Sequence, residues 1–328
     1  MSRKAGGAKS LRIKVASMRD ADTAALAKVA YQARQASERG SPDLSVARFK
    51  EALDAATDDN NLKVLLCMSD RSDDLLGWLS LYTGFARMVF IGEWHPEVLP
   101  SDSYGVVARK LIREAKKATR RMGKERLEVQ FNKVTSRIRP LLQRYEGWYR
   151  EERFRYATEE TYMEAAITDK MPKFNELDGL TIKPISEVSN EDLFEPFFDS
   201  FLDSKDGLFL SLTKDQQIDS FNYWFSRTRQ FVDDATLCVI DNDRVTGFIV
   251  VREEEGKAHV GPIGVLPKHR GKGIARNLLA RSMASIRLQG FKKVALEMDI
   301  LNTPAMNLYK QFGFQSIHNS VYYYWNAK

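Results

Sequence analysis

The sequence predicts an α/β (α+β) fold that is written twice, each copy a mixed, mostly antiparallel sheet flanked by helices. Three observations support this prediction. The chain has 328 residues, about twice the length of a typical domain. Short matches recur along it at a nearly constant separation. Its second half alternates β-rich and helical segments around a hairpin, which favours a mixed sheet over a doubly wound parallel one.

The internal matches define the two copies. Val98-Leu99-Pro100 recurs as Val265-Leu266-Pro267, a shift of 167 residues, and Ala108-Arg109 recurs as Ala275-Arg276. Further on, Tyr162 matches Tyr322 at a shift of 160, which predicts about seven extra residues in the first copy near 145–153. We therefore expect a flexible tail over residues 1–10, a first domain over 11–170 and a second over 171–328. The polar segment around Met171 is the expected linker.

The elements of the second copy follow from periodicity and turn residues. Apolar residues at helical spacing and β-branched runs between turn signals predict, in order, a strand, two helices, a hairpin, a strand, a helix, a strand, a helix and a final strand. Their expected ranges are 180–185, 190–202, 213–229, 236–240 with 244–252, 258–265, a helix carrying Ile274 to Ile286, 294–300, 305–312 and 321–325.

The segment from Val265 to Ala275 carries the first chemical signal. A predicted strand ends, a loop with Gly271 and Gly273 follows, and an amphipathic helix begins. Backbone N–H groups at a helix start bind anions, and glycines let a phosphate approach closely. Arg270 and Lys272 add positive charge. The Walker pattern and the dinucleotide glycine spacing are both absent.

A second motif follows at Asn302. Thr303 is expected to cap a helix with Pro304 at its first position, and Gly313 to end it. Arg270-Gly-Lys-Gly273-Ile-Ala275, followed by Asn302-x-x-Ala-x-x-Leu308-Tyr309-x-x-x-Gly-Phe314, resembles the paired motifs of the GNAT superfamily of N-acetyltransferases. The resemblance covers residues 180–328 well and 11–167 only as a degenerate copy. The tandem arrangement resembles mycothiol synthase.

The resemblance implies an acetyl-CoA site. Backbone amides from Arg270 through Gly271, Lys272, Gly273 and Ile274 to Ala275 would hold the pyrophosphate. The strand Ile263-Gly264-Val265 would bind the pantetheine, and Pro262 suits a splayed strand. Asn302 would position the second cofactor-facing helix, which also carries Leu308. Tyr309 would protonate the leaving thiolate, since a phenol near pKa 10 can protonate a thiolate near 8.5.

The general base has two candidates at this stage. His259 falls where mycothiol synthase has a glutamate, and a histidine can serve as a base near neutral pH. A carboxylate acting through water is the alternative, with Glu253, Glu254 and Glu255 just upstream. The acceptor pocket in such folds is lined by the first two helices and the last strands. Most of the aromatic residues there are expected to be core, some to line the pocket: Phe194, Phe197, Phe198, Phe201, Phe209, Phe221, Tyr223, Trp224, Phe225, Tyr322, Tyr323 and Tyr324.

The first copy lacks these groups, because Ser103 to Val106 stand opposite the glycine loop and Leu142 stands opposite Tyr309. We expect it to be non-catalytic. It carries a basic segment, with 12 basic against 3 acidic residues between Arg109 and Arg139. The first part of this segment, residues 109–126, is expected to be a helix. Such a run either attracts nucleic acid or an acidic protein or is a solvated surface.

The sequence thus predicts an acetyl-CoA-dependent N-acetyltransferase acting on a primary amine by direct attack in a ternary complex. A small-molecule amine is the preferred acceptor; a peptide N-terminus or lysine is the alternative. A non-catalytic acetyl-CoA-binding module that docks through its basic half is the rival from another class. Two cysteines exclude a cysteine zinc cluster, so no metal is expected. No apolar run is long enough for a membrane span, and no signal peptide pattern is present, so a cytoplasmic protein is expected.

Overall fold

A computed structural model describes residues 11–35, 44–101, 104–135, 138–168, 172–174, 176–228, 231–254 and 256–327. The expected tail over residues 1–10 and Met171 of the expected linker lie outside these ranges. The chain forms two compact units. Unit 1 comprises Met1–Ala157 and Ser320–Lys328, and unit 2 comprises Thr158–Asn319.

The limits of the units differ from the boundary expected at residue 170. The strand that follows the last helix of each copy is 12 residues long: β7 spans Arg155–Ala166 and β13 spans Gln315–Asn326. From Thr158, β7 belongs to unit 2, where it pairs with the neighbouring strand, and from Ser320, β13 belongs to unit 1. Most of the last strand of the first copy therefore belongs to unit 2, and the end of the last strand of the second copy belongs to unit 1.

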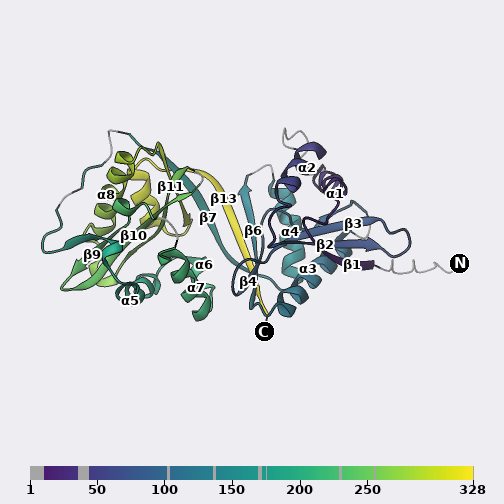
Figure 1. Cartoon of the computed structure of the whole chain (residues 1–328), viewed down its shortest axis with the longest axis horizontal. Helices are drawn as coiled ribbons and strands as arrows, with labels where there is room; N and C mark the ends of the chain where they lie inside the picture. Colours follow the sequence, from purple (N-terminus) through teal and green to yellow (C-terminus); the bar gives the residue numbers. More distant parts are fainter. Residues whose placement is uncertain are drawn as a thin grey trace. The chain divides into compact units, whose positions relative to one another are not determined.

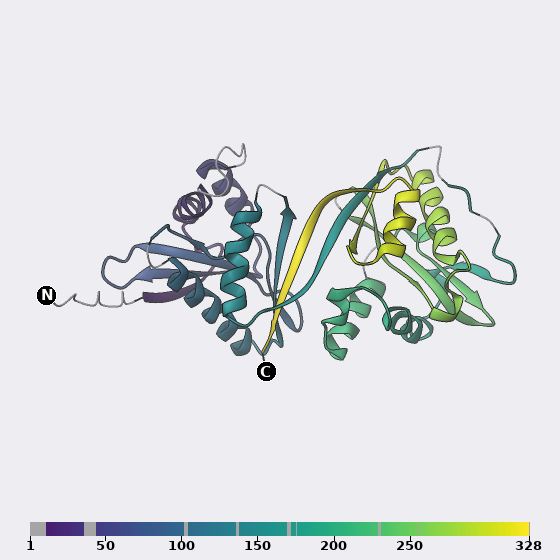
Figure 2. The same cartoon turned by 180° about the vertical axis from the view of Figure 1, so that it is seen from behind.

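Unit 1 contains a sheet with strand order β1-β2-β3-β4-β6, which the end of β13 continues. Neighbouring strands run antiparallel except β4 and β6, which are parallel. Helices α3 and α4 lie over one face of this sheet (Figure 2). The elements are β1 (Leu11–Ser17), α1 (Thr23–Gln35), α2 (Val46–Ala55), β2 (Leu62–Ser69), β3 (Leu75–Tyr82), β4 (Met88–Ile91), β5 (Glu97–Val98), α3 (Tyr104–Arg121), β6 (Arg126–Val134) and α4 (Arg139–Glu151).

Unit 2 contains a sheet with strand order β7-β12-β11-β10-β9-β8 (Figure 1). Only β11 and β12 are parallel among its pairs. Its elements are β8 (Thr181–Pro184), α5 (Asn190–Phe201), α6 (Gly207–Leu210), α7 (Lys214–Phe225), β9 (Leu237–Asp241), β10 (Arg244–Glu254), β11 (Lys257–Val265), α8 (Ile274–Leu288), β12 (Lys293–Asp299), α9 (Thr303–Gln311) and β13, with three short 3₁₀ turns at 185–187, 233–235 and 267–269.

The prediction of a mixed, mostly antiparallel sheet flanked by helices is confirmed in both units. The order of the main elements is also the same in both: a strand, two helices, three strands, a helix, a strand, a helix and a strand. Three details differ from expectation. The second helix of the repeat ends at Phe225, the short helix α6 was not foreseen, and the final strand begins at Gln315.

Two apolar layers hold unit 2 together, one on each face of its sheet. On one face, α8 and α9 bury residues such as Leu278, Met283 and Phe312 against alternate residues of β11 and β12. On the other, α5 and α7 bury a cluster of phenylalanines against β10. Val260 and Leu296 face α8. Because side chains alternate along a strand, His259 and Glu297 face the opposite side, toward α5 and α7. This alternation assigns the polar residues of the sheet to one face.

Candidate active site

Strands β11 and β12 separate partway along their length. Their parallel pairing runs from Ala258↔Val294 to Val260↔Leu296, although β11 continues to Val265 and β12 to Asp299. Opposite β10, the register shifts between Val260 and Ile263, so Gly261 and Pro262 form a β-bulge. Beyond Val260, β11 therefore presents backbone groups toward an opening rather than toward β12, as expected of the splayed strand.

The turn after β11 has the geometry of an anion site. Gly271 and Gly273 have φ values of 75° and 78°, a conformation that glycine adopts without a steric cost. A Cβ atom at either position would meet no atom within 4 Å, so both glycines face open space. Gly273 is the N-cap of α8 and supplies no side-chain cap to the first turn. The amides at the start of this 15-residue helix are thus available to an anion.

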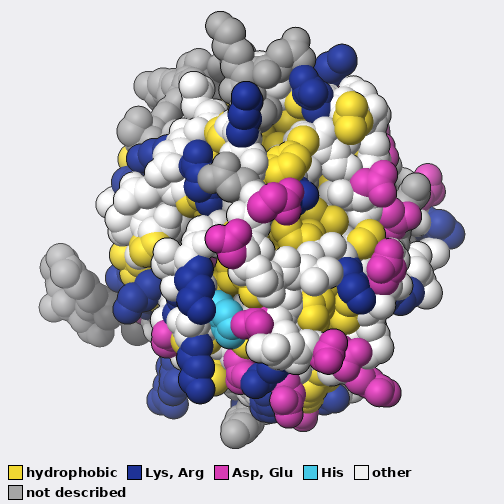
Figure 3. All heavy atoms as spheres, turned by 90° about the vertical axis from the view of Figure 1, so that its left-hand side faces the viewer, with side chains coloured by type: hydrophobic (Ala, Val, Ile, Leu, Met, Phe, Trp, Pro, Cys, Tyr) yellow, Lys and Arg dark blue, Asp and Glu magenta, His cyan; other side chains and the backbone are white. Residues whose placement is uncertain are grey.

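Charge around the turn favours an anionic ligand. Lys268, Lys272 and Arg276 are exposed in the turn and at the start of α8, whereas α5 carries four acidic residues. In the view of unit 2 in Figure 3, basic side chains predominate on one side and acidic side chains on the other. Lys272 has no ion-pair partner in the described part of the chain. It is the mobile cation best suited to a phosphate at this turn.

Arg270 has a different environment from the one its motif position suggested. Its guanidinium donates to the carbonyls of Val265 (3.2 Å) and Ser200 (3.0 Å) and pairs with Asp203 at 2.7 Å. This pairing lowers the pKa of the Asp203 carboxyl. Its backbone N–H donates to Pro267. Arg270 thus ties the end of β11 to the end of α5 and positions the turn, while the amides from Gly271 onward remain for a ligand.

Replacing Gly273 by Ala tests the turn. We expect a loss of about 1 kcal/mol in unfolding free energy, because alanine disfavours a φ of 78°, together with weaker binding of acetyl-CoA. Calorimetric titration and thermal unfolding measure the two effects. Gly290→Ala is the matched control, since Gly290 has a φ of 87° and also faces open space. Equal loss of acetyl-CoA affinity in both variants would contradict a binding role for the turn.

Helix α9 begins at the second motif. Asn302 is its N-cap, and the Asn302 side chain accepts a hydrogen bond from the Ala305 amide at 3.3 Å. Thr303, the residue expected to cap, is instead the first helical residue, because the chain turns one residue earlier. Leu308 is half-buried against the α8–α9 core. Asn302 thus caps the start of α9, which is consistent with the positioning role expected of it.

Tyr309 is buried near the end of α9, where its ring packs against Phe314 at 5.7 Å. No described residue makes a hydrogen bond to its hydroxyl. Burial raises the pKa of the Tyr309 phenol well above its ordinary value. The phenol is therefore protonated throughout the physiological range, as a proton donor must be, although burial weakens it as an acid.

His259 lies beside two carboxylates. Its Nδ1 is 3.5 Å from Oε2 of Glu254, the last residue of β10. Glu297 is the first residue of β12 beyond the last β11–β12 pair, so its side chain leaves the sheet where the strands separate. Surrounding protein atoms and the neighbouring Glu254 raise the pKa of Glu297, and His259 lowers it, while solvent still reaches the residue. The structure brings together a histidine and two carboxylates at the mouth of the opening.

A third carboxylate on this face is already neutralised. Glu164 of β7 pairs with Lys257 at 2.6 Å and with Lys293 at 3.1 Å. The two lysines hold the pKa of Glu164 at about 2, and Tyr162 donates to the same carboxylate. Glu164 is consequently a poor base, which distinguishes it from Glu297. Lys257, two residues before His259, is likewise occupied by this pair.

Sequence reasoning missed Glu297. The signal was present, because Glu297 is a single acidic residue inside the apolar strand Val294–Met298 and has the same parity as Ala295, the partner of His259. Among the upstream glutamates considered as bases, Glu254 contacts His259, Glu253 is exposed, and Glu255 lies outside the described residues.

The aromatic residues expected around the acceptor are mostly core. Those of α5, α6 and α7 form one packed cluster, from which Tyr223 emerges exposed. Trp224 lies against Gly261, where a Cβ atom would be 2.4 Å from the indole. The expectation that Tyr322, Tyr323 and Tyr324 belong to this pocket is wrong, because β13 enters unit 1 from Ser320.

Unit 1 lacks the equivalent groups. Its helix α3 begins at Tyr104, whose ring packs against Trp148 at 5.6 Å, and Leu142 is buried in the core. The basic region is helical only to Arg121, because β6 starts at Arg126. Several of its cations have partners within the unit: Arg109 with Glu151, Arg113 with Glu152, Arg121 and Lys117 with Glu114, and Lys116 and Arg120 with the Trp325 ring. A docking role for nucleic acid or an acidic protein finds no support here.

The described residues contain neither a metal cluster nor a membrane-spanning helix. Among the described residues, no group of three or more His, Cys, Asp or Glu side chains is arranged to hold a metal ion. None of the described helices combines the length and the apolar composition that a membrane crossing requires.

The splayed sheet, the uncapped glycine turn and the tyrosine helix define an acyltransferase fold and site. Residues 191–314 match the acetyltransferase (GNAT) family. An N-alpha-acetyltransferase of Sulfurisphaera tokodaii is 32% identical over 120 residues, 32% of this chain and 72% of that protein. The chain belongs to the GNAT acetyltransferase family and is an acyltransferase.

Two further similarities concern the tandem type. A mycothiol acetyltransferase of Kocuria rhizophila is 34% identical over 89 residues, covering 25% of this chain and 29% of that protein. A solved tandem GNAT protein from the clavulanic acid biosynthesis pathway has the same fold, with a TM-score of 0.50, 15% identity, and coverage of 97% of this chain and 99% of that chain. The chain thus has the tandem GNAT fold.

Proposed function

We propose that unit 2 transfers an acetyl group from acetyl-CoA to a primary amine by direct attack in a ternary complex, and that unit 1 is non-catalytic. The observation that carries the proposal is the opening between β11 and β12, which leads to the glycine turn and has Glu297 at its mouth. Within the family, acetyl-CoA is the acetyl donor, and the residues here fit it. The amides from Gly271 to Ala275 and the Lys272 ammonium would hold the pyrophosphate.

The chain's own groups account for each step. Backbone groups of Ile263-Gly264-Val265 align the pantetheine, and an amide there polarises the thioester carbonyl. Glu297, assisted by His259, accepts the proton that the acceptor ammonium must lose. The amine nitrogen then forms a bond to the carbonyl carbon and the carbon–sulfur bond breaks. Tyr309, on the α8–α9 side of the sheet, donates its proton to the departing thiolate. The nitrogen loses its second proton as it becomes an amide, and this proton balances the one that Tyr309 gives up.

The acceptor side favours a cationic small molecule. Glu254 and Glu297 lie beside His259 on the α5–α7 face, and two carboxylates attract an ammonium before it is deprotonated. The similarity to an N-alpha-acetyltransferase supports a second candidate, a peptide N-terminus. The likeness to mycothiol acetyltransferases supports the small amine.

A panel of acceptors tests the proposal. Thiol release from acetyl-CoA is measured with small amines, with peptides bearing free N-termini and with the same peptides blocked, and products are identified by mass. Release that depends on a small amine and yields its N-acetyl derivative is the expected result. Faster acetylation of free peptide N-termini would favour the second candidate. Binding of acetyl-CoA without release in any arm would leave a non-catalytic binding module and overturn the proposal.

A further inference from the structure

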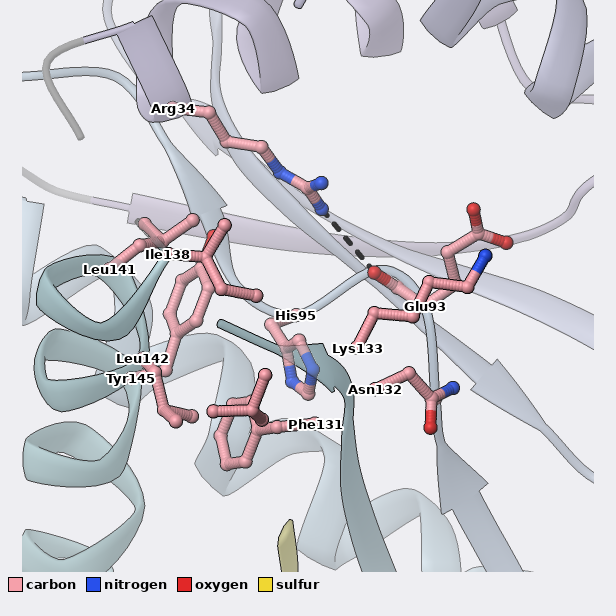
Figure 4. A pocket seen from close by; sticks show the side chains of 12 residues that line it. Arg34, Glu93, His95, Phe131, Asn132, Lys133, Ile138, Leu141, Leu142 and Tyr145 are labelled. Atoms are coloured by element: carbon pink, nitrogen blue, oxygen red, sulfur yellow. Dashed lines mark hydrogen bonds between the residues drawn. The ribbon is translucent and has the colours of Figure 1, made fainter. Parts of the chain in front are cut away.

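Unit 1 contains a pocket of about 350 Å³ that the proposed function does not use (Figure 4). It opens where β4 and β6 separate, since their parallel pairing ends at Ile91↔Val129 while β6 continues to Val134. Helix α4 forms one wall, and the chain after β4 forms another. Its volume falls in the range of sites for small molecules.

The inside of the pocket is aromatic and aliphatic. His95 stacks on Phe131 with ring centroids 4.2 Å apart, and the Tyr145 ring is nearly parallel to Phe131, at 10°. Leu141 and Leu142 of α4 complete this surface (Figure 4). Flat and branched apolar groups are the natural occupants of such walls.

The polar groups behind these walls are satisfied by one another. The buried carboxylate of Glu97 accepts from Arg34 Nε at 2.9 Å and from the Tyr145 hydroxyl at 3.1 Å. Nδ1 of His95 is 3.3 Å from the Tyr149 hydroxyl. Burial and the positive charge of Arg34 lower the pKa of His95 to about 3, so the imidazole is neutral. The Arg34 guanidinium in the lining is already paired with Glu97, so the interior favours an uncharged ligand group.

The rim, by contrast, carries both signs of charge. Lys133 of β6 and Glu93 of the loop after β4 are exposed there, and Asn132 lies beside Lys133 (Figure 4). Lys133 has a φ of 52°, an uncommon conformation for a lysine, which sets the direction of its side chain. Arg34 donates to the Glu93 carbonyl at 3.3 Å and so fixes the segment that carries the rim carboxylate. Neither Lys133 nor Glu93 has an ion-pair partner among the described residues.

We propose that this pocket binds a free α-amino acid with an apolar or aromatic side chain. The side chain enters the aromatic interior, the α-carboxylate meets Lys133, and the α-ammonium meets Glu93. An uncharged interior with a rim of two opposite charges matches such a zwitterion, whereas a ligand with one charge would satisfy only half of the rim.

Three ligands of the same shape test the proposal on the full-length chain: L-phenylalanine, 3-phenylpropionate without the ammonium, and phenethylamine without the carboxylate. Calorimetric titration is expected to give the tightest binding for L-phenylalanine, by about 3- to 5-fold over each analogue, as an exposed ion pair supplies. Equal affinity for all three, or no saturable binding of any, would overturn the proposal. Displacement of L-phenylalanine by acetyl-CoA would also overturn it, since the pocket would then be a thioester site.

Charge variants assign the two ends of the ligand. Lys133→Gln should remove the advantage of L-phenylalanine over phenethylamine, and Glu93→Gln its advantage over 3-phenylpropionate. Lys28→Gln, an exposed lysine of α1 outside the pocket lining, is the control and should change neither. Leu142→Trp should abolish all binding by filling the interior, provided its unfolding midpoint shows a folded chain. Retained binding in that variant, or equal effects of Lys133→Gln and Lys28→Gln, would contradict this assignment.

Discussion

Replacing Tyr309 by Phe is expected to lower kcat by about 10²- to 10⁴-fold with little change in acetyl-CoA affinity, the range that general acid catalysis supplies. The substitution removes one oxygen from a buried ring and leaves the packing against Phe314 in place. Because no described residue bonds to that hydroxyl, folding should be nearly unaffected. Steady-state kinetics and calorimetric titration with acetyl-CoA measure the two quantities.

The control is Tyr82→Phe in unit 1, a half-buried tyrosine whose ring also contacts a phenylalanine, Phe85. It should leave kcat unchanged. If Tyr309→Phe retained wild-type kcat while chemistry limits turnover, Tyr309 would not be the proton donor. A large loss of acetyl-CoA affinity with normal kcat would instead indicate a packing role.

Replacing Glu297 by Gln is expected to lower kcat/KM by about 10²-fold or more at neutral pH and to change its pH profile. A base must be deprotonated, so activity rises with pH through the pKa of the base. Partial desolvation of its carboxyl raises the pKa of Glu297 although the residue is exposed, which moves this rise to higher pH than for an ordinary glutamate. The variant should lose that rise, because glutamine does not titrate.

Two companions make the result specific. Glu253→Gln removes an exposed carboxylate two strands away and should keep both the rate and the profile. His259→Asn removes the side chain that lowers the pKa of Glu297, so the rise should move to higher pH. If His259→Asn abolished the rise and Glu297→Gln kept it, the histidine, one of the two candidates from the sequence, would be the base.

Much of the fold could be predicted from local patterns. The hairpin around Asp241–Asp243, the strand–turn–helix ending in α8 and the glycine positions are all encoded within a few residues, so periodicity and turn chemistry find them. Local patterns failed where a choice depended on distant partners. Arg270 is bound by α5, and the final strand crosses into unit 1, and neither fact has a local signature.

The candidate site divides in the same way. Tyr309 and the turn from Gly271 to Ala275 could be found from motif spacing because their roles depend on backbone geometry that a short segment fixes. Glu297 could not be ranked above the other carboxylates from the sequence. It differs from Glu164 in the charged groups that lie close to it in space, and these come from other strands. Two lysines neutralise Glu164, whereas partial desolvation and the nearby Glu254 raise the pKa of the exposed Glu297.

By itself, the sequence determined that one α/β unit occurs twice, that only the second copy has the glycine turn and the tyrosine, and that the chemistry is acyl transfer. Only the tertiary structure decided which carboxylate is neutralised by lysines and which is not, that Arg270 ties the turn to α5, and that the first copy holds an aromatic pocket with a charged rim. The physical reason is that backbone conformation follows from neighbouring residues, whereas pKa values, ion pairs and cavities depend on which strands and helices meet in space.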